Sequence, residues 1–298
     1  MNELIVEGQK IKITNPEKLL WPEVQIRKID YLQYLIQIAP YLLSHTKDRV
    51  LTSIRYPNGI GKPSFYQKHL PKKAPDFVDT LKIDGDTFIN LNSLPTLLWL
   101  GNLAALEFHT TFNRGNENEL TSLVFDLDPS EGQSFDDVRQ CALLIHQELQ
   151  NLGIKAYPKT SGATGLQIFI PTKKYTFEQA RKINTFFGKY FVQKYPEKMT
   201  IERQIKKRGS LLYFDYLQMW RGKNIISVYS PRAVPHANLS MPIEWNELEV
   251  GLSPSSFTLM NAAERLSKKG DLFDAIEKFH AINHSTLLDQ ILYNEKHV

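Results

Sequence analysis

Apolar positions recur along the chain with two different periods, and these periods predict its helices and strands. A spacing of three to four residues predicts amphipathic helices over Asp30 to Ser44, over Ser134 to Asn151 and over Thr176 to Lys194. Uninterrupted apolar runs at 122–127 and 211–217 are typical of strands buried in a sheet. The two later helices begin with a hydroxyl residue that is followed three positions on by Asp or Gln, which is the pattern of a helix N-cap.

Further short elements complete the pattern. Asp84 and Gly85 separate two short segments, and this dipeptide is typical of a tight β-hairpin. The remaining predicted elements are strands at 50–56, 105–110, 154–159, 165–170 and 224–229 and a short helix at 94–103.

The order of the central elements predicts the fold class. From residue 122 to residue 217 the order is β-α-β-β-α-β, which is typical of ferredoxin-like and RNA-recognition-like sheets. We therefore expect a mixed α+β protein with such a core, in which the first and last strands of the unit lie close together. Because one fold hosts many activities, the function has to be argued from the side chains.

Composition and charge narrow the class of protein without identifying a function. The chain has 298 residues, 42% of them hydrophobic and 23% charged, and a net charge of +4, as expected for a mildly basic globular protein. It has no apolar stretch long enough to span a bilayer, and its first residues lack a secretory leader pattern. The single cysteine, Cys141, permits neither a disulfide nor a cysteine-based zinc site. We expect a cytoplasmic protein without a membrane partner.

Two carboxylates, Asp126 and Asp128, lie at the end of the apolar run at 122–127. Asp126 and Asp128 point to the same side of a strand, where they repel each other unless a cation neutralises them. Asp215 lies in the run at 211–217, where a carboxylate without a partner is unfavourable. If the two runs are neighbouring strands, the three carboxylates suit two Mg²⁺ or Mn²⁺ ions of a phosphoryl-transfer centre. The alternative is that Asp126 and Asp128 only cap the turn that follows.

A glycine-rich loop and several cations are candidates for binding an anion near these acids. Ser161 and Thr164 lie in a Ser-Gly-Ala-Thr-Gly loop between two predicted strands, and such a loop can turn N–H and hydroxyl donors toward a phosphate. Arg221, Lys223 and Arg232 follow the last predicted strand of the central unit, and we interpret them as nucleotide-binding residues. A plain hairpin turn and a solvated charged surface are the alternatives.

Three histidines and two aromatic residues have more than one interpretation. His109 ends a predicted strand, where a structural hydrogen bond is a common role. His280 and His284 are four residues apart without a further ligand, so we expect them on the surface. Phe65 and Tyr66 follow a glycine-containing turn, and they either stack on a DNA base or belong to the core.

In combination, five segments resemble the polymerase domain of bacterial ligase D, which belongs to the archaeo-eukaryotic primase superfamily. The segments are TNPEKLLWP (14–22), LEFHTTFNR (106–114), VFDLDP (124–129), TSGATGLQIFIP (160–171) and LYFDYLQMWRGKNIISVYSPRA (212–233). The resemblance implies a primase-type fold in which an N-terminal α/β extension precedes the β-α-β-β-α-β core. It further implies one domain over 1–298, made of an N-terminal lobe at 1–115, a catalytic core at 116–250 and a C-terminal helical extension at 251–298.

The resemblance also implies a reaction and its site. The reaction is template-directed addition of NTP or dNTP to a 3′-hydroxyl at gaps and broken DNA ends in non-homologous end joining, with two Mn²⁺ or Mg²⁺ ions. The residues at matching positions are Asp126, Asp128 and Asp215 for the metals, His109, Ser161 and Arg232 for the triphosphate, and Asn15, Lys18 and Lys28 for the 5′-phosphate of DNA. The Ku protein and a DNA ligase module become candidate partners, and the expected location is the nucleoid within the cytoplasm.

Two positions depart from the family's Ser-Gly-x-Lys-Gly-Leu-His loop, since Thr164 replaces the lysine and Gln167 the histidine. Loss of an ammonium group from a triphosphate site weakens binding by about 1 to 3 kcal/mol, unless Lys159 or Lys223 supplies the charge. The departures favour one alternative function, a non-catalytic DNA-end-binding module. A primase that starts chains de novo shares the acids and the fold, whereas an unrelated metal-dependent phosphohydrolase leaves the N-terminal segment unexplained.

Overall fold

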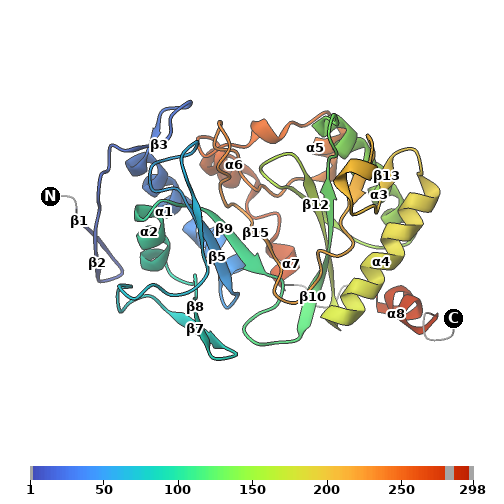
Figure 1. The fold of residues 1–298 in the computed structure, drawn as a ribbon, viewed down its shortest axis with the longest axis horizontal. Coiled ribbons are helices and arrows are strands. Elements are labelled where there is room, and N and C mark those ends of the chain that lie inside the picture. The colour runs from blue at the N-terminus through green and yellow to red at the C-terminus, as the bar shows by residue number, and fades with distance from the viewer. Residues whose placement is uncertain (1–2, 279–284, 295–298) are drawn as a thin grey trace. The chain divides into compact units, whose positions relative to one another are not determined.

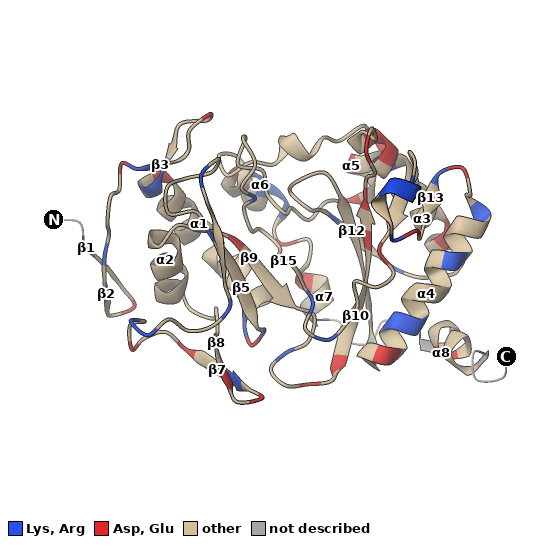
Figure 2. Ribbon diagram, in the orientation of Figure 1, with Lys and Arg blue, Asp and Glu red and all other residues tan. Residues whose placement is uncertain are grey.

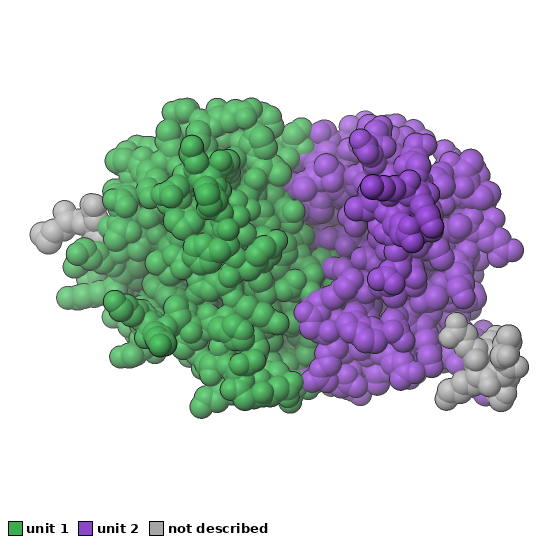
Figure 3. Space-filling view, in the orientation of Figure 1, with its two compact units in different colours: residues 1–116, 224–241, 255–271 green, residues 117–223, 242–254, 272–298 purple. Residues whose placement is uncertain are grey.

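Residues 3–278 and 285–294 are described by a computed structural model, and they form two compact units. Unit 1 contains residues 1–116, 224–241 and 255–271, and unit 2 contains residues 117–223, 242–254 and 272–298 (Figure 3). The chain therefore leaves unit 1 after residue 116 and returns to it twice. Lysine and arginine positions are spread over both units and alternate with acidic positions, which agrees with the small net charge (Figure 2).

Unit 2 is built around a five-stranded sheet with the strand order β11-β12-β10-β14-β13 (Figure 1). Its strands are β10 (Glu119–Asp128), β11 (Tyr157–Thr160), β12 (Leu166–Thr176), β13 (Met199–Thr200) and β14 (Leu212–Phe214), and its two long helices are α3 (Phe135–Asn151) and α4 (Phe177–Lys194). The predicted β-α-β-β-α-β order is present, with β13 added parallel to β14. β10 lies between β12 and β14 and is antiparallel to both, so the first and last strands of the predicted unit are neighbours.

The helices α3 and α4 begin at their predicted caps. The Ser134 hydroxyl accepts a hydrogen bond from the amide of Asp137, and the Thr176 hydroxyl accepts one from the amide of Gln179. In both cases the third helical side chain returns a bond to the cap amide, which satisfies two backbone donors at each start.

Phenylalanines attach α4 to one face of the unit 2 sheet. Phe125 of β10 packs against Phe187 and Phe191 of α4 and against Phe214 of β14, with ring centroids 5.0 to 6.1 Å apart. Side chains alternate between the faces of a strand, so Asp126 projects from the opposite face of the sheet.

Unit 1 contains a four-stranded sheet with the strand order β15-β9-β5-β6. Its strands are β5 (Leu51–Arg55), β6 (Phe65–Gln67), β9 (Ala105–Thr111) and β15 (Asn224–Ile226), and its helices are α1 (Lys28–Thr46), α2 (Leu94–Asn102) and α6 (Ala262–Lys269). Three two-stranded sheets pair β1 (Glu3–Val6) with β2 (Gln9–Lys12), β3 (Leu19–Trp21) with β4 (Ile26–Arg27), and β7 (Thr80–Ile83) with β8 (Asp86–Ile89). The turn between β7 and β8 is the predicted hairpin, with Asp84 and Gly85 in left-handed conformations.

Two strands differ from the sequence predictions. The strand expected at 224–229 is the short β15, and it pairs with β9, so residues 224–241 belong to unit 1 and not to the core expected over 116–250. The strand expected at 211–217 ends at Phe214, because the carboxylate of Asp215 accepts a hydrogen bond from the amide of Leu217 and turns the chain.

Five further helices lie in the rest of the described chain. They are η1 (Ile205–Lys207), α5 (Trp245–Glu249), η2 (Pro254–Ser256), α7 (Asp274–Lys278) and α8 (Ser285–Asn294). Within unit 2, α7 packs against β12 and α8 against α4. Among the described residues, no helix combines the length and the apolar character needed to cross a membrane.

Replacing Gly101 by Ala should lower the free energy of unfolding by about 1 to 3 kcal/mol, the range for an overpacked core. A Cβ atom at this position of α2 would overlap the Leu35 side chain of α1, although alanine is otherwise favoured in helices. Urea unfolding measures the change. In a Leu35→Ala background the same replacement should be neutral or stabilising, and a Gly101→Ala protein more stable than the parent would contradict this packing.

Candidate functional site

β14 lies beside β10 in a register that sets Asp215 opposite Asp126. Leu127 pairs with Phe214, and the next position of this antiparallel register brings the two aspartates across from each other. The amide nitrogen of Asp215 donates to the carbonyl oxygen of Asp126 over 2.9 Å. Directly opposite residues project from the same face, and Asp128 shares that face because it lies two residues after Asp126. The three acids thus occupy one face of the sheet.

Two further polar residues extend this row across the sheet. The registers place Gln167 of β12 opposite Asp126 and Lys159 of β11 opposite Gln167. The side-chain amide of Gln167 donates to the Asp126 carboxylate over 3.1 Å, while its own oxygen is buried without a hydrogen-bond partner. Lys159 is fully buried. The row therefore contains one cation, one amide and the facing pair of aspartates.

The Asp126 carboxyl is poorly stabilised in its ionised form. Burial and the negative charge of Asp128, with a smaller contribution from Asp215, raise its pKa from 3.8 to about 8. The hydrogen bond from Gln167 and the charge of Lys159 act in the opposite direction without cancelling the rise. A cation bound at this face would remove the repulsion and keep the carboxylates ionised.

The Asp215 carboxylate is engaged by its neighbours. It accepts hydrogen bonds from the Tyr213 hydroxyl at 3.2 Å and from the Leu217 amide at 3.0 Å, and the Lys223 ammonium lies 3.7 Å away. Within residues 3–278 and 285–294, no group of three or more His, Cys, Asp or Glu side chains is arranged to hold a metal ion. The three aspartates nevertheless offer only oxygen donors. The side-chain oxygen of Gln167, which is buried without a hydrogen-bond partner, lies beside them. These residues therefore fit a hard divalent cation that keeps some of its waters.

The glycine-rich loop is closed around Ser161. Its hydroxyl oxygen accepts hydrogen bonds from the amides of Ala163 and Gly165, so these donors point into the loop. A Cβ atom at Gly165 would collide with the carbonyl oxygen of Leu127, so glycine is required for the loop to approach β10. Thr164 is exposed at the tip of the loop.

In unit 1, His109 and Arg232 meet at a buried carboxylate that the sequence analysis missed. Glu107 lies two residues before His109 on β9, and its Oε2 atom is 2.9 Å from His109 Nε2 and 3.4 Å from an Arg232 nitrogen. Its Oε1 atom accepts a hydrogen bond from the amide of Ala233 over 2.9 Å. Burial alone would raise the pKa of Glu107, but the contacts with His109, Arg232 and Ala233 hold it below its usual value. An acid within an apolar strand, two residues from a histidine, was the available signal.

The segment that carries Arg232 is fixed by unusual backbone geometry. Tyr229 has a positive φ of 64°, and its carbonyl oxygen accepts a hydrogen bond from the Tyr34 hydroxyl over 2.5 Å. The Ser230 hydroxyl accepts from the amide of Phe108 in β9 over 2.8 Å. These contacts hold the Arg232 backbone beside the strand that carries His109.

The residues matched to a DNA 5′-phosphate lie at the start of unit 1. Asn15 has a positive φ of 48°, and the Lys18 ammonium donates to the carbonyl oxygen of Pro57 over 2.8 Å. The Lys28 ammonium is buried and donates to the carbonyl oxygens of Thr14 and Asn102. Burial, together with the positive charge of Lys18, lowers the pKa of Lys28 to about 8. An anion between the two ammonium groups would relieve their repulsion.

Phe65 and Tyr66 lie on the surface of unit 1, so the interpretation as core residues is wrong. They are 46% and 75% exposed on β6, the edge strand of the sheet. The Arg55 guanidinium lies 4.9 Å from the centre of the Phe65 ring. Exposed rings beside a cation are a suitable surface for stacking on a base.

Other predicted residues occupy simpler surroundings. Arg221 lies 3.4 Å from the Asn118 side chain on the surface. Cys141 is buried, and burial raises its thiol pKa to about 11, so it stays protonated at neutral pH. His280 and His284 lie outside the described residues.

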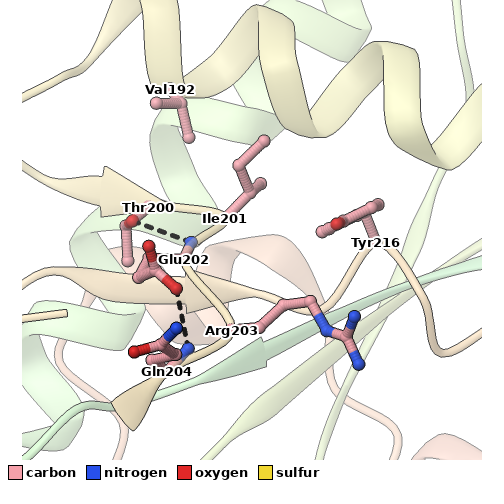
Figure 4. Close-up of a pocket in the computed structure, with 7 residues that line it drawn as sticks. All are labelled: Val192, Thr200, Ile201, Glu202, Arg203, Gln204 and Tyr216. Atoms are coloured by element: carbon pink, nitrogen blue, oxygen red, sulfur yellow. Dashed lines mark hydrogen bonds between the residues drawn. The ribbon is translucent and has the colours of Figure 1, made fainter. Parts of the chain in front are cut away.

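A hollow of about 820 Å³ in unit 2 does not coincide with the predicted site. It is lined by Val192, Thr200, Ile201, Glu202, Arg203, Gln204 and Tyr216 (Figure 4). The Thr200 hydroxyl and the Glu202 carboxylate accept hydrogen bonds from the backbone amides of Glu202 and Gln204, which hold its wall in place. None of the predicted metal or nucleotide ligands lines it.

Comparisons with known proteins place these observations in a family. The family model described as LigD, primase-polymerase domain, matches residues 27–273. The bifunctional non-homologous end joining protein LigD of Bacillus subtilis is 37% identical over 263 residues, which cover 88% of this chain and 43% of that protein. The multifunctional LigD of Mycolicibacterium smegmatis is 27% identical, with 90% of this chain and 36% of that protein covered. The chain thus spans less than half the length of these curated relatives.

A solved structure is similar over nearly its whole length. The polymerase domain from Mycobacterium tuberculosis ligase D, in complex with DNA, matches with a TM-score of 0.85 and 28% sequence identity. The match covers 91% of this chain and 99% of that one.

Replacing Asp126 by Asn should raise the thermal stability of the metal-free protein at pH 8 by about 5 °C, with little effect at pH 4. Folding raises the pKa of this carboxyl from 3.8 to about 8. As the pH rises from 3.8 to about 8, ionisation of Asp126 therefore increasingly destabilises the folded state relative to the unfolded state. Thermal melts in EDTA at both pH values measure the difference, with the exposed Asp136→Asn variant as a control. An equal gain at pH 4 and pH 8 would contradict the electrostatic cause.

Proposed function

This chain belongs to the LigD primase-polymerase domain family, and from that membership we propose that it is a template-directed nucleotidyltransferase acting at gaps and ends of broken DNA. It adds ribo- or deoxyribonucleotides to a 3′-hydroxyl during non-homologous end joining. The observation that carries the proposal is that Asp126, Asp128 and Asp215 share one face of the unit 2 sheet. A ferredoxin-like core within a primase-type fold positions these three acids.

The three acids would hold two Mn²⁺ or Mg²⁺ ions, for which their oxygen donors are suited. When bound, such ions activate the primer 3′-oxygen and stabilise the charge of the leaving pyrophosphate. To hold a cation, Asp215 would give up its present hydrogen bonds from Tyr213 and Leu217. Gln167 remains as the hydrogen-bond donor that orients the Asp126 carboxylate.

The nucleotide triphosphate is bound by cations and hydroxyl groups. In unit 1, His109 and Arg232 supply charged donors whose positions are fixed by β9 and by the segment after Tyr229. In unit 2, the Ser161 hydroxyl retains its hydrogen as a donor, because the observed loop bonds use only its oxygen as an acceptor. Thr164, Arg221 and Lys223 complete the proposed set, and Lys223 supplies the ammonium group that position 164 lacks.

DNA is bound in the same proposal by residues of unit 1. Asn15, Lys18 and Lys28 contact the 5′-phosphate of the downstream strand, since the two neighbouring ammonium groups form a site suited to an anion. Phe65 and Tyr66 stack on a base, which agrees with their exposure. The solved relative from Mycobacterium tuberculosis is described as a complex with DNA, which supports a DNA substrate for this chain. Ku and a DNA ligase module are the proposed partners, because the curated relatives are named bifunctional or multifunctional end-joining proteins.

A non-catalytic DNA-end-binding module is the second candidate function. Two features of the glycine-rich loop favour it. The amides of Ala163 and Gly165 donate to the Ser161 hydroxyl and not toward a ligand. The exposed residue at the tip is Thr164, where the resemblance implies a lysine. Extension of a primer on a gapped duplex bearing a 5′-phosphate, with NTP and dNTP compared and Mn²⁺ present, decides between the two. Omitting the primer tests the primase alternative in the same assay.

Replacing Asp126 by Ala should reduce primer extension by about a thousandfold or more, because both proposed cations lose a shared ligand. DNA affinity, measured by fluorescence anisotropy on the same gapped duplex, should change by about twofold or less, since phosphate contacts elsewhere dominate it. Asp136→Ala, which removes an exposed acid from the same unit, is the matched control and should retain activity. Full extension by the Asp126→Ala protein would refute the metal assignment.

The preference for a 5′-phosphate over a 5′-hydroxyl should fall by about three- to tenfold between pH 7 and pH 9. The pKa of Lys28 is lowered to about 8, so its ammonium group loses a proton between pH 7 and pH 9. The neutral amine attracts phosphate less strongly. Competition between the two DNA ends at each pH measures the preference. The Lys28→Gln protein should show a small preference that does not vary with pH, whereas Lys12→Gln, on the exposed strand β2, should behave like the parent. A constant preference in the parent would exclude Lys28 as a phosphate ligand.

A further inference from the structure

A surface of unit 2 beside α4 combines accessible aromatic rings with unpaired cations. It consists of the hollow that Arg203 and Tyr216 help to line and of the segment that leads from Tyr216 to Trp220 (Figure 4). The residues that line the hollow differ from the ligands proposed for the metals, the nucleotide and the 5′-phosphate. The proposed reaction therefore leaves this surface without a role.

The segment after β14 follows α4 in the opposite direction. A Cβ atom added at Gly188 of α4 would lie 3.4 Å from the Cβ atom of Tyr216, so the two backbones approach closely at this point. About two turns nearer the start of α4, the Arg181 guanidinium lies 4.3 Å from the centre of the Trp220 ring. Since a helical turn rises about 5.4 Å, the two aromatic residues lie along α4 at levels about 11 Å apart.

Both aromatic rings can be reached from solvent. Trp220 is 47% exposed, and Tyr216 is partly exposed where it lines the hollow. Arg181 fixes the Trp220 ring by packing on it and places a positive charge beside it. Single-stranded nucleic acids bind to such surfaces because their unpaired bases stack on aromatic side chains. The bases of a duplex already stack on one another, so a duplex cannot use the rings in this way.

The loop between β13 and β14 supplies further positive charge. Arg203, Lys206 and Lys207 are exposed, and within the described part of the chain none of them pairs with an acid. Arg208 holds the backbone of this loop, because its guanidinium donates to the carbonyl oxygens of Glu202 and Arg203 over 2.9 and 3.2 Å. Unpaired cations on a fixed loop suit the phosphates of a nucleic-acid backbone.

One acid of the same loop opposes an anion, but it is turned away from the aromatic ring. Glu202 and Arg203 extend from the loop in opposite directions, with Arg203 on the side of Tyr216 (Figure 4). The Glu202 carboxylate accepts a hydrogen bond from the Gln204 amide over 2.8 Å. Its charge still reduces the attraction of the loop for phosphate, so removal of that charge should strengthen binding.

We propose that this surface binds single-stranded DNA, with bases stacked on Trp220 and Tyr216 and phosphates paired with the cations of the loop. The surface begins one residue after Asp215, a proposed metal ligand, so a strand bound here would continue away from the acids. The unpaired overhang of a broken DNA end has the required chemistry. The proposal takes from the proposed function only that DNA is the substrate, and it requires neither metal ions nor a nucleotide.

The test is the binding of a fluorescent oligothymidylate of about 12 nucleotides, with a 5′-hydroxyl end, to the intact protein in EDTA. Trp220→Ala should lower the affinity about tenfold, the effect of losing one stacked base. Arg203→Gln should lower it about threefold and reduce the slope of log affinity against log salt by about 0.7. Glu202→Gln, which can keep the bond to the Gln204 amide, should raise the affinity about twofold.

Three controls separate this surface from the rest of the protein. Phe186→Ala removes a 40% exposed ring from the side of α4 that is turned away from Gly188, and it should bind like the parent. A blunt duplex of similar length should bind equally to the parent and to Trp220→Ala, because its bases are not free to stack. The effect of Phe65→Ala in unit 1 should add to that of Trp220→Ala, since the two rings belong to different surfaces.

Equal affinity of the parent, Trp220→Ala and Arg203→Gln for the oligothymidylate would overturn the proposal. Polyglutamate that binds as tightly as the oligothymidylate would also overturn it and would indicate an acidic protein partner instead.

Photo-cross-linking of an oligonucleotide that contains iodouracil to the parent protein decides the question even if Trp220→Ala does not fold. Modification of Tyr216 or Trp220 supports the proposal, and modification confined to Phe65 and Tyr66 contradicts it. A protein that extends no primer yet loses oligothymidylate affinity in Trp220→Ala supports this inference and contradicts the proposed reaction.

Discussion

The antiparallel register between β10 and β14 is the constraint on which the proposed chemistry depends. A slip of one residue would turn Asp215 to the face covered by α4, because side chains alternate along a strand. The register is held by apolar packing on that covered face, where Phe125 and Phe214 meet Phe187 and Phe191 of α4. Aromatic side chains on one face of the sheet thus determine where the acids lie on the other.

Each unit contains a buried ionisable side chain whose charged form the neighbouring residues do not fully stabilise. In unit 2 the pKa of Asp126 is raised because Asp128 and Asp215 lie near it in a buried position, while in unit 1 the pKa of Lys28 is lowered by burial and by Lys18. Divalent cations would reduce the repulsion among the acids around Asp126, and a phosphate would reduce the repulsion between Lys28 and Lys18. A polymerase needs both kinds of ligand, so these opposite shifts agree with one activity. Glu107 differs from both, since its contacts with His109, Arg232 and Ala233 already lower its pKa.

Local features of the fold could be predicted from the sequence, and long-range ones could not. The helix caps at Ser134 and Thr176 and the turn at Asp84 depend on residues at most three positions apart, and each is present. The pairing of β15 with β9 joins segments far apart in the chain, and no local pattern specifies it. The same limit applies to the site. The acids were recognisable as a motif, but the burial of Lys159 and the contact of Glu107 with Arg232 depend on which segments become neighbours.

The interleaving of the two units has a consequence for how the protein is made. The sheet of unit 1 is complete only when β15 joins β9, and the entire β-α-β-β-α-β unit is translated between these two strands. During synthesis, one edge of β9 therefore stays unpaired while residues 117–223 of unit 2 emerge from the ribosome. Pairings between such distant segments form slowly, and an unpaired edge is a site for association with other chains. Nascent chains stalled before residue 226 would thus carry an unfinished sheet, and chaperone demand should be greatest at that stage of synthesis.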